Sequence, residues 1–151
     1  MFLSDVDKQK IAGVLAAEPG VELAYLYGSY ATGLAYENSD VDIGIVVNPA
    51  LAKSVDFKYE SDLAMKIEEV LHKEVDLRTI NKAQISFLHQ IVSTGKILFA
   101  SSDKTRVEFE TKTLMNYLDF KPVNDLYEEY RNKRLERGEF GVKYKRHTPA
   151  H

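Results

Sequence analysis

Apolar residues recur along the chain with two alternating spacings, which predicts an α/β fold. An apolar stripe at helical spacing follows a capping box at Ser4 and Asp7 and ends at Pro19-Gly20. The next run, Val21 to Tyr27, has the length and the β-branched and aromatic composition of a buried strand. The same patterns predict helices at about 57–72, 82–94 and 101–136, and strands at 74–80, 96–100 and 43–47, the last opened by two aspartates. We therefore expect a small mixed sheet flanked by helices, with C-terminal helices following it; the sequence leaves the strand order open.

Polar residues, prolines and glycines are expected to set the ends of these elements. Asn48-Pro49 ends the second strand and opens a loop of about eight residues. Asn81 can cap the helix that begins at residue 82, and Gly95 ends that helix. Pro122 interrupts the last helical pattern, so we expect two helices that meet near residues 120–123 rather than a continuous rod.

Two aspartates stand one residue apart at the start of the second strand. Side chains alternate across a strand, so Asp40 and Asp42 share one face and their backbones lie ~7 Å apart. Paired acids on a core-facing strand need a compensating cation, because like charges repel and desolvation is expensive. Hard oxygen ligands at this spacing indicate Mg²⁺.

A Gly-Ser turn precedes this pair by ten residues. Gly28 allows a phosphate to approach the backbone, Ser29 adds a hydroxyl donor, and the N–H groups that begin a helical turn are free to bind an anion. Taken separately, the turn and the aspartate pair have ordinary structural interpretations, as a loop and a strand entrance. Together they favour a site for a phosphate and a metal ion.

This constellation resembles the signature of the nucleotidyltransferases of the DNA polymerase beta superfamily, in particular the minimal MntA-type antitoxins. The resemblance covers nearly the whole chain and implies the DNA polymerase beta-like fold. That family supplies a third metal-site carboxylate from a later strand, and Asp76 in the run EVDLR is the matching position. The resemblance implies catalytic and metal-binding roles, with two Mg²⁺ ions, for Asp40, Asp42 and Asp76. It implies nucleotide binding by Gly28, Ser29, Asp40 and Asp42.

The chain departs from many of these relatives in the ten-residue spacer. Where they carry arginines, this sequence has Tyr30, Thr32 and Tyr36. Either tyrosine could stack on a base or hydrogen-bond a phosphate, and an ordinary packing role is an equal alternative for both. Asp76 shares a strand face with Arg78, and without the resemblance a surface ion pair would be the preferred interpretation of these two residues.

The resemblance also implies an activity and a partner. It implies transfer of AMP from ATP to a tyrosine hydroxyl of a cognate HEPN ribonuclease toxin of the HepT type, with release of pyrophosphate. One alternative is nucleotidylation of a small molecule such as an aminoglycoside. Another is a binding module that silences its partner by stoichiometric contact and whose metal site is vestigial.

Composition and charge limit the remaining classes of function. At 151 residues, 44% hydrophobic and 28% charged, the chain is expected to form one soluble domain at 1–137 and a flexible basic tail at 138–151. It contains no cysteine, signal-peptide pattern or membrane-length apolar run, which is compatible with a cytoplasmic protein that binds no membrane. Residues 1–130 carry a net charge of −8 and residues 131–151 a net charge of +5. The acidic body argues against nucleic acid as a direct ligand. His89 lies within an apolar helical pattern and is expected to be hydrogen-bonded or exposed rather than catalytic.

Overall fold

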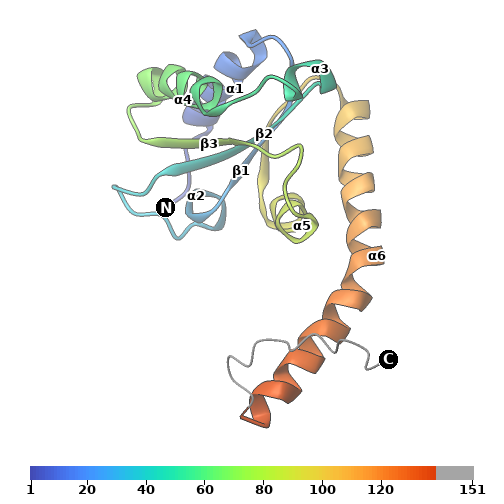
Figure 1. The fold of residues 1–151 in the computed structure, drawn as a ribbon. Helices are drawn as coiled ribbons and strands as arrows, with labels where there is room; N and C mark the ends of the chain where they lie inside the picture. Colours follow the sequence, from blue (N-terminus) through green and yellow to red (C-terminus); the bar gives the residue numbers. More distant parts are fainter. Residues whose placement is uncertain (139–151) are drawn as a thin grey trace. The chain divides into compact units, whose positions relative to one another are not determined.

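A computed structural model describes residues 1–138, in two compact units that divide between Tyr117 and Leu118. The first unit carries a four-stranded sheet and its covering helices (Figure 1). The strands are β1 (Val21–Tyr27), β2 (Val41–Val47), β3 (Val75–Thr79) and β4 (Lys96–Ala100). The helices are α1 (Asp5–Ala17), α2 (Ser29–Thr32), α3 (Pro49–Ala52), α4 (Phe57–Leu71), α5 (Ile85–Thr94) and α6 (Asp103–Glu136).

The sheet is mixed, as the sequence predicts. Its order is β3-β2-β1-β4; β1 runs antiparallel to β2 and β4, while β2 and β3 run parallel. The parallel pair is joined by a crossover that contains α4, which a parallel connection requires. The C-terminal end of β1 therefore lies beside the N-terminal ends of β2 and β3.

Alternating side chains divide the core between the two faces of the sheet. On one face Ile43 and Ile45 of β2 pack with Ile11 and Leu15 of α1 and with apolar residues of α4, such as Ile67. In Figure 1, α1 and α4 lie together on this side. The opposite face carries Asp42, Gly44 and Val46 of β2. This second face is the one that holds the candidate chemistry.

The second face is covered in part by α5 and by the first turns of α6. Leu23, Tyr25, Val46, Ile80 and Ile91 form its buried cluster. Tyr25 packs against Phe109 of α6, and its hydroxyl donates a hydrogen bond to Glu110 Oε1 at 2.9 Å. The beginning of α6 thus belongs to the same unit as the sheet.

The helix ends follow the local sequence, with two corrections. Ser4 caps α1 as predicted, because its hydroxyl accepts a hydrogen bond from the Asp7 amide at 3.1 Å. The loop expected after β2 contains the short helix α3, which Asn48 caps. The prediction that Asn81 caps the next helix is wrong: α5 begins at Ile85. The Asn81 amide instead binds the backbone of Val47, accepting from its N–H at 2.9 Å and donating to its C=O at 2.7 Å.

The expected break at Pro122 is also wrong, because α6 is helical from Asp103 to Glu136 with Pro122 inside it. Proline removes one backbone hydrogen bond, and ion pairs at helical spacing, such as Lys121 with Asp125 at 2.7 Å, support the turns around it. Most large apolar residues of α6 are exposed. The predicted flexible basic tail lies, apart from Gly138, outside the described residues.

Candidate active site

The strand register brings two of the predicted aspartates side by side. Asp42 of β2 pairs with Asp76 of the parallel strand β3, and on its other side with Tyr27 of the antiparallel strand β1. Neighbouring strands lie about 4.8 Å apart, so the backbones of Asp42 and Asp76 are adjacent and their side chains share a face. Asp40 precedes the first residue of β2 and is exposed. The third carboxylate of the sequence motif therefore stands beside the second, although 34 residues separate them.

Gly28 joins the end of β1 to α2 directly against this pair. Its backbone has φ 72° and ψ −152°, a conformation that essentially only glycine adopts. A Cβ atom at this position would lie 2.2 Å from Asp42 Oδ2. Glycine is thus required twice over, by the backbone conformation and by the carboxylate that packs against it. The half-buried Ser29 begins α2 beside it.

The electrostatics of the site are those of crowded carboxylates. Burial raises the pKa of Asp42 above its usual value, and the charges of Asp76 and Asp40 raise it further, while Arg78 offsets part of the rise. An ionised carboxyl group among like charges is unfavourable unless a cation joins it. The protein therefore carries a concentration of negative charge at this end of the sheet.

Glu74 is a further acidic group that the sequence pattern did not single out. The neighbouring Asp40 raises the pKa of Glu74, first through side-chain hydrogen bonding and then through its charge. The main chain connects the same two segments, since the Val41 N–H donates to the Glu74 C=O at 2.8 Å. A polar hollow of about 490 Å³ opens here, lined by Glu37, Asn38, Ser39, His72, Lys73 and Glu74. Only the parallel register of β2 and β3 reveals that Glu74 lies beside the motif.

Tyr27 is a second residue whose place only the fold discloses. Its ring packs edge-on against Phe87 of α5, with ring centres 5.5 Å apart. Burial raises the pKa of its hydroxyl to about 12, with contributions from the charges of Asp42 and Asp76. Tyr27 therefore stays neutral at physiological pH and borders the carboxylates on the β1 side.

The spacer residues Tyr30, Thr32 and Tyr36 occupy different environments in the structure, and His89 lies outside the site. Tyr30 is 1% exposed and belongs to the core, so packing is its role and base stacking by this ring is ruled out. Tyr36 is 80% exposed and remains available to a ligand. Thr32 lies in α2, and its hydroxyl faces the Gly28 C=O at 3.4 Å. His89 stacks on Tyr117 and hydrogen-bonds Ser93, as expected for a residue outside the site.

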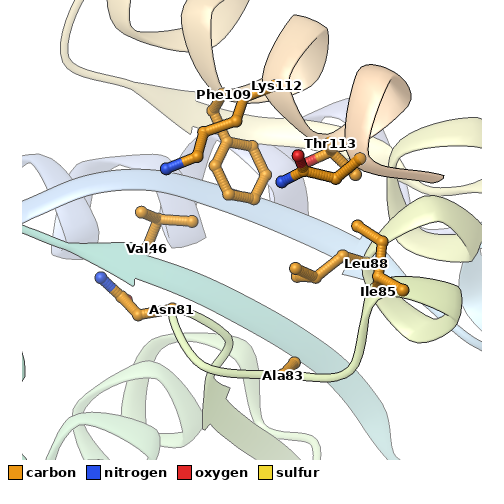
Figure 2. A pocket seen from close by; sticks show the side chains of 9 residues that line it. Val46, Asn81, Ala83, Ile85, Leu88, Phe109, Lys112 and Thr113 are labelled. Carbon is orange, nitrogen blue, oxygen red and sulfur yellow. The ribbon is translucent and has the colours of Figure 1, made fainter. Parts of the chain in front are cut away.

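Another hollow on the same sheet face lies away from the aspartates. It has a volume of about 500 Å³ and sits between β2, α5 and α6 (Figure 2). Its lining consists of Val46, Asn81, Ala83, Ile85, Leu88, Phe109, Lys112, Thr113 and Asn116. Val46 is four residues beyond Asp42, ~13 Å along the strand. This hollow and the cluster of acids are therefore separate features.

The carboxylates of the site could hold Mg²⁺ together with the oxygens of a bound phosphate. Among residues 1–138, no group of three or more His, Cys, Asp or Glu side chains is arranged to hold a metal ion unaided. The adjacent carboxylates of Asp42 and Asp76, of which Asp42 has a raised pKa, nevertheless call for a cation. Mg²⁺ usually takes one or two protein carboxylates and completes its shell with water and substrate phosphates. Asp40, Asp42 and Asp76 are the residues that suit this role.

Comparison with known proteins identifies the family. A family model described as polymerase beta nucleotidyltransferase matches residues 9–104, from within α1 to the first residues of α6. The chain belongs to this nucleotidyltransferase family. Over 116 residues this chain is 30% identical to the protein adenylyltransferase MntA of Shewanella oneidensis, and the match covers 76% of this chain and 80% of the relative.

Solved structures show the same fold. A crystal structure of a toxin–antitoxin with AMP-PNP matches with a TM-score of 0.67 and 28% identity, over 81% of this chain and 95% of the other. A complex of a tri-AMPylated HEPN toxin from Shewanella oneidensis with MNT antitoxin matches with a TM-score of 0.65 and 25% identity, over 84% and 97% of the two chains. The expected family and fold class are thus confirmed. No helix within residues 1–138 is long and apolar enough to span a membrane.

Proposed function

We propose that this nucleotidyltransferase transfers AMP from ATP to a tyrosine hydroxyl of a cognate HEPN ribonuclease toxin, releasing pyrophosphate and silencing the toxin. The observation that carries the proposal is the pairing of Asp42 with Asp76 in register, with Gly28 packed against the Asp42 carboxylate. The kinship with a protein adenylyltransferase and with toxin–antitoxin structures supports it. ATP is present in the cytoplasm, where we expect the protein to act.

Each predicted site residue has a part in this proposal. Asp40 and Asp42 would hold the two expected Mg²⁺ ions, and Asp76 would complete the set of carboxylates. Gly28 leaves its backbone accessible to the triphosphate, and Ser29 offers its hydroxyl to a phosphate oxygen. When bound, Mg²⁺ neutralises charge on the triphosphate and on the departing pyrophosphate.

The transfer itself needs no covalent intermediate on the protein. The acceptor oxygen forms a bond to the α-phosphorus, and the bond from that phosphorus to the oxygen bridging the α- and β-phosphates breaks. Pyrophosphate leaves with the electron pair of that bond, and the hydroxyl proton passes to the Asp76 carboxylate, which lies on the edge strand of the sheet. The chain contributes positioning and charge, which suffice for phosphoryl chemistry of this kind.

A protein acceptor is favoured by the surface of α6. Large apolar residues that are at least 40% exposed recur along this helix, at Val107, Leu114, Met115, Leu118, Val123, Leu126, Tyr127, Tyr130 and Leu135. Exposed apolar surface on this scale is typical of a site that binds another protein. A small-molecule acceptor would give no reason for it.

Removal of the metal tests the nucleotide site directly. Calorimetry should detect ATP binding to the purified chain with Mg²⁺ and lose it when a chelator is added, because the carboxylates repel an unscreened triphosphate. Addition of partner should then give a mass gain in steps of one AMP. Equal ATP affinity with Mg²⁺ and with chelator would remove the metal-bridged site from the proposal.

A further inference from the structure

Arg78 places a cation among the carboxylates of the site. It lies two residues after Asp76 on β3 and shares its face. Its guanidinium forms a fork on the Asp76 carboxylate, with Nη2 to Oδ2 at 3.2 Å and Nε to Oδ1 at 3.5 Å. The Arg78 side chain is 62% exposed. An exposed pair of this kind contributes little to stability, so the fork is easily exchanged for another anion.

The surroundings of Arg78 direct its charge toward the site. In the strand register Arg78 stands opposite Gly44, which offers no side chain, and next to the Asp42–Asp76 pair. Its charge acts on both Asp42 and Tyr27. The guanidinium therefore stands over the same face of the sheet as the two carboxylates.

The spacer between the Gly-Ser turn and the aspartates contains no lysine or arginine from residue 30 to residue 39. A triphosphate entering beside Asp40, Asp42 and Asp76 meets strong repulsion, which metal ions offset only in part. A planar guanidinium binds phosphate oxygens through two parallel hydrogen bonds, as it binds the Asp76 carboxylate here. Arg78 has the charge, the geometry and the exposure that this task requires.

We propose that Arg78 is the phosphate-binding arginine of this chain, and that its guanidinium moves from the Asp76 carboxylate to the nucleotide triphosphate when ATP binds. The inference rests on the proposed nucleotidyltransferase function. It assigns to β3 the cationic contact that the spacer does not supply. The exchange also frees Asp76 for the metal and the acceptor.

A double-mutant cycle separates this role from a merely structural one. The affinity for a non-hydrolysable ATP analogue with Mg²⁺ is measured for the wild type, Arg78→Gln, Asp76→Asn and the double variant, with Lys104→Gln as a control. Lys104 also pairs with a carboxylate, Glu108 at 3.9 Å, but on the surface of α6. Arg78→Gln should weaken binding of the analogue about tenfold or more and reduce its salt dependence, whereas AMP binding should change much less. Arg78→Lys should retain part of the affinity, since it keeps the charge but loses the fork.

The decisive comparison is made in the Asp76→Asn background. An arginine that contacts phosphate still matters there, so the double variant should bind the analogue about tenfold more weakly than Asp76→Asn alone. Equal affinity of the double and single variants, or wild-type affinity of Arg78→Gln, would overturn the inference. If the wild type binds the analogue but transfers no AMP, the proposed function fails while the cycle still decides on Arg78. If the wild type binds no nucleotide, both proposals fall.

Discussion

Gly28, in the turn after β1, packs against the Asp42 carboxylate of β2. Gly28 adopts a conformation closed to other residues, at the point where the Asp42 carboxylate approaches within 2.2 Å of where a Cβ would be. The sequence motif predicted that both residues matter. It could not show that they touch, because that contact depends on the antiparallel register of β1 and β2.

Gly28→Ala should therefore impair both the fold and the nucleotide site. We expect a loss of stability on the order of 1 to 3 kcal/mol from backbone strain, and displacement of the Asp42 carboxylate with loss of ATP binding. Thermal unfolding and calorimetry measure the two effects. Gly13→Ala is the matched control: Gly13 lies in α1 with open space around it, so alanine there should stabilise by roughly 0.5 to 1 kcal/mol. Normal ATP affinity in a folded Gly28→Ala variant would contradict the assignment.

The charge of Asp42 should cost stability at neutral pH. The pKa of Asp42 is raised in the folded state, so the folded chain binds its proton more tightly than the unfolded chain and stability falls as pH rises past the ordinary value of 3.8. Asp42→Asn removes this penalty and should raise the melting temperature at pH 7, with the difference disappearing below about pH 3.8. Thermal melts from pH 3 to pH 7 test it. A lower melting temperature of Asp42→Asn than of the wild type at pH 7 would contradict this account, because it would show that the Asp42 carboxylate stabilises the folded protein.

At the scale of elements, hydrophobic periodicity gave β1, β4 and the body of α1 and α4, because their apolar spacing is unambiguous. The errors fall where a polar or proline residue has more than one possible role. Asn81 has the side chain of a helix cap, yet the end of β2 presents both a donor and an acceptor to it, and the two bonds to Val47 outcompete a cap. Proline usually interrupts a helix because it lacks a backbone N–H, yet α6 continues through Pro122. The residue types around Asn81 and Pro122 do not show which partners the tertiary structure or the neighbouring helical turns will supply.

Asn81→Ala tests whether this amide fastens β2 to the chain after β3. Loss of two hydrogen bonds to the Val47 backbone should destabilise the protein by about 1 to 3 kcal/mol. Chemical denaturation gives the difference in the free energy of unfolding. Asn116→Ala, at an exposed position of α6, should change it by less than about 0.5 kcal/mol. Equal effects of the two substitutions would leave Asn81 without its structural role.

For the whole molecule, the signature of Gly28, Ser29, Asp40 and Asp42 was enough to indicate the family, and Asp76 followed from the resemblance. The sequence alone does not place Glu74 and Arg78 beside Asp42, because they lie far from it along the chain. Tyr27 adjoins Gly28 in the sequence, but it pairs with Asp42 only through the antiparallel register of β1 and β2. The place of Glu74 and Arg78 follows from the parallel pairing of β2 with β3, which a crossover containing α4 joins. These residues also do not indicate which molecule accepts the AMP. The central claim is that AMP is transferred to a protein partner, and it must be tested with that partner.

One pair of assays on Asp76→Asn tests this claim most directly, with Asp62→Asn on α4 as the control. The mass of the partner toxin is measured after incubation with ATP and Mg²⁺, and its toxicity is measured when both proteins are expressed together. With a transferase, wild type and Asp62→Asn should add AMP and neutralise the toxin, whereas Asp76→Asn should reduce turnover by at least ~10²-fold and restore toxicity. Full neutralisation by Asp76→Asn, without any gain in partner mass, would contradict the enzymatic account and leave a protein that silences its partner by binding alone.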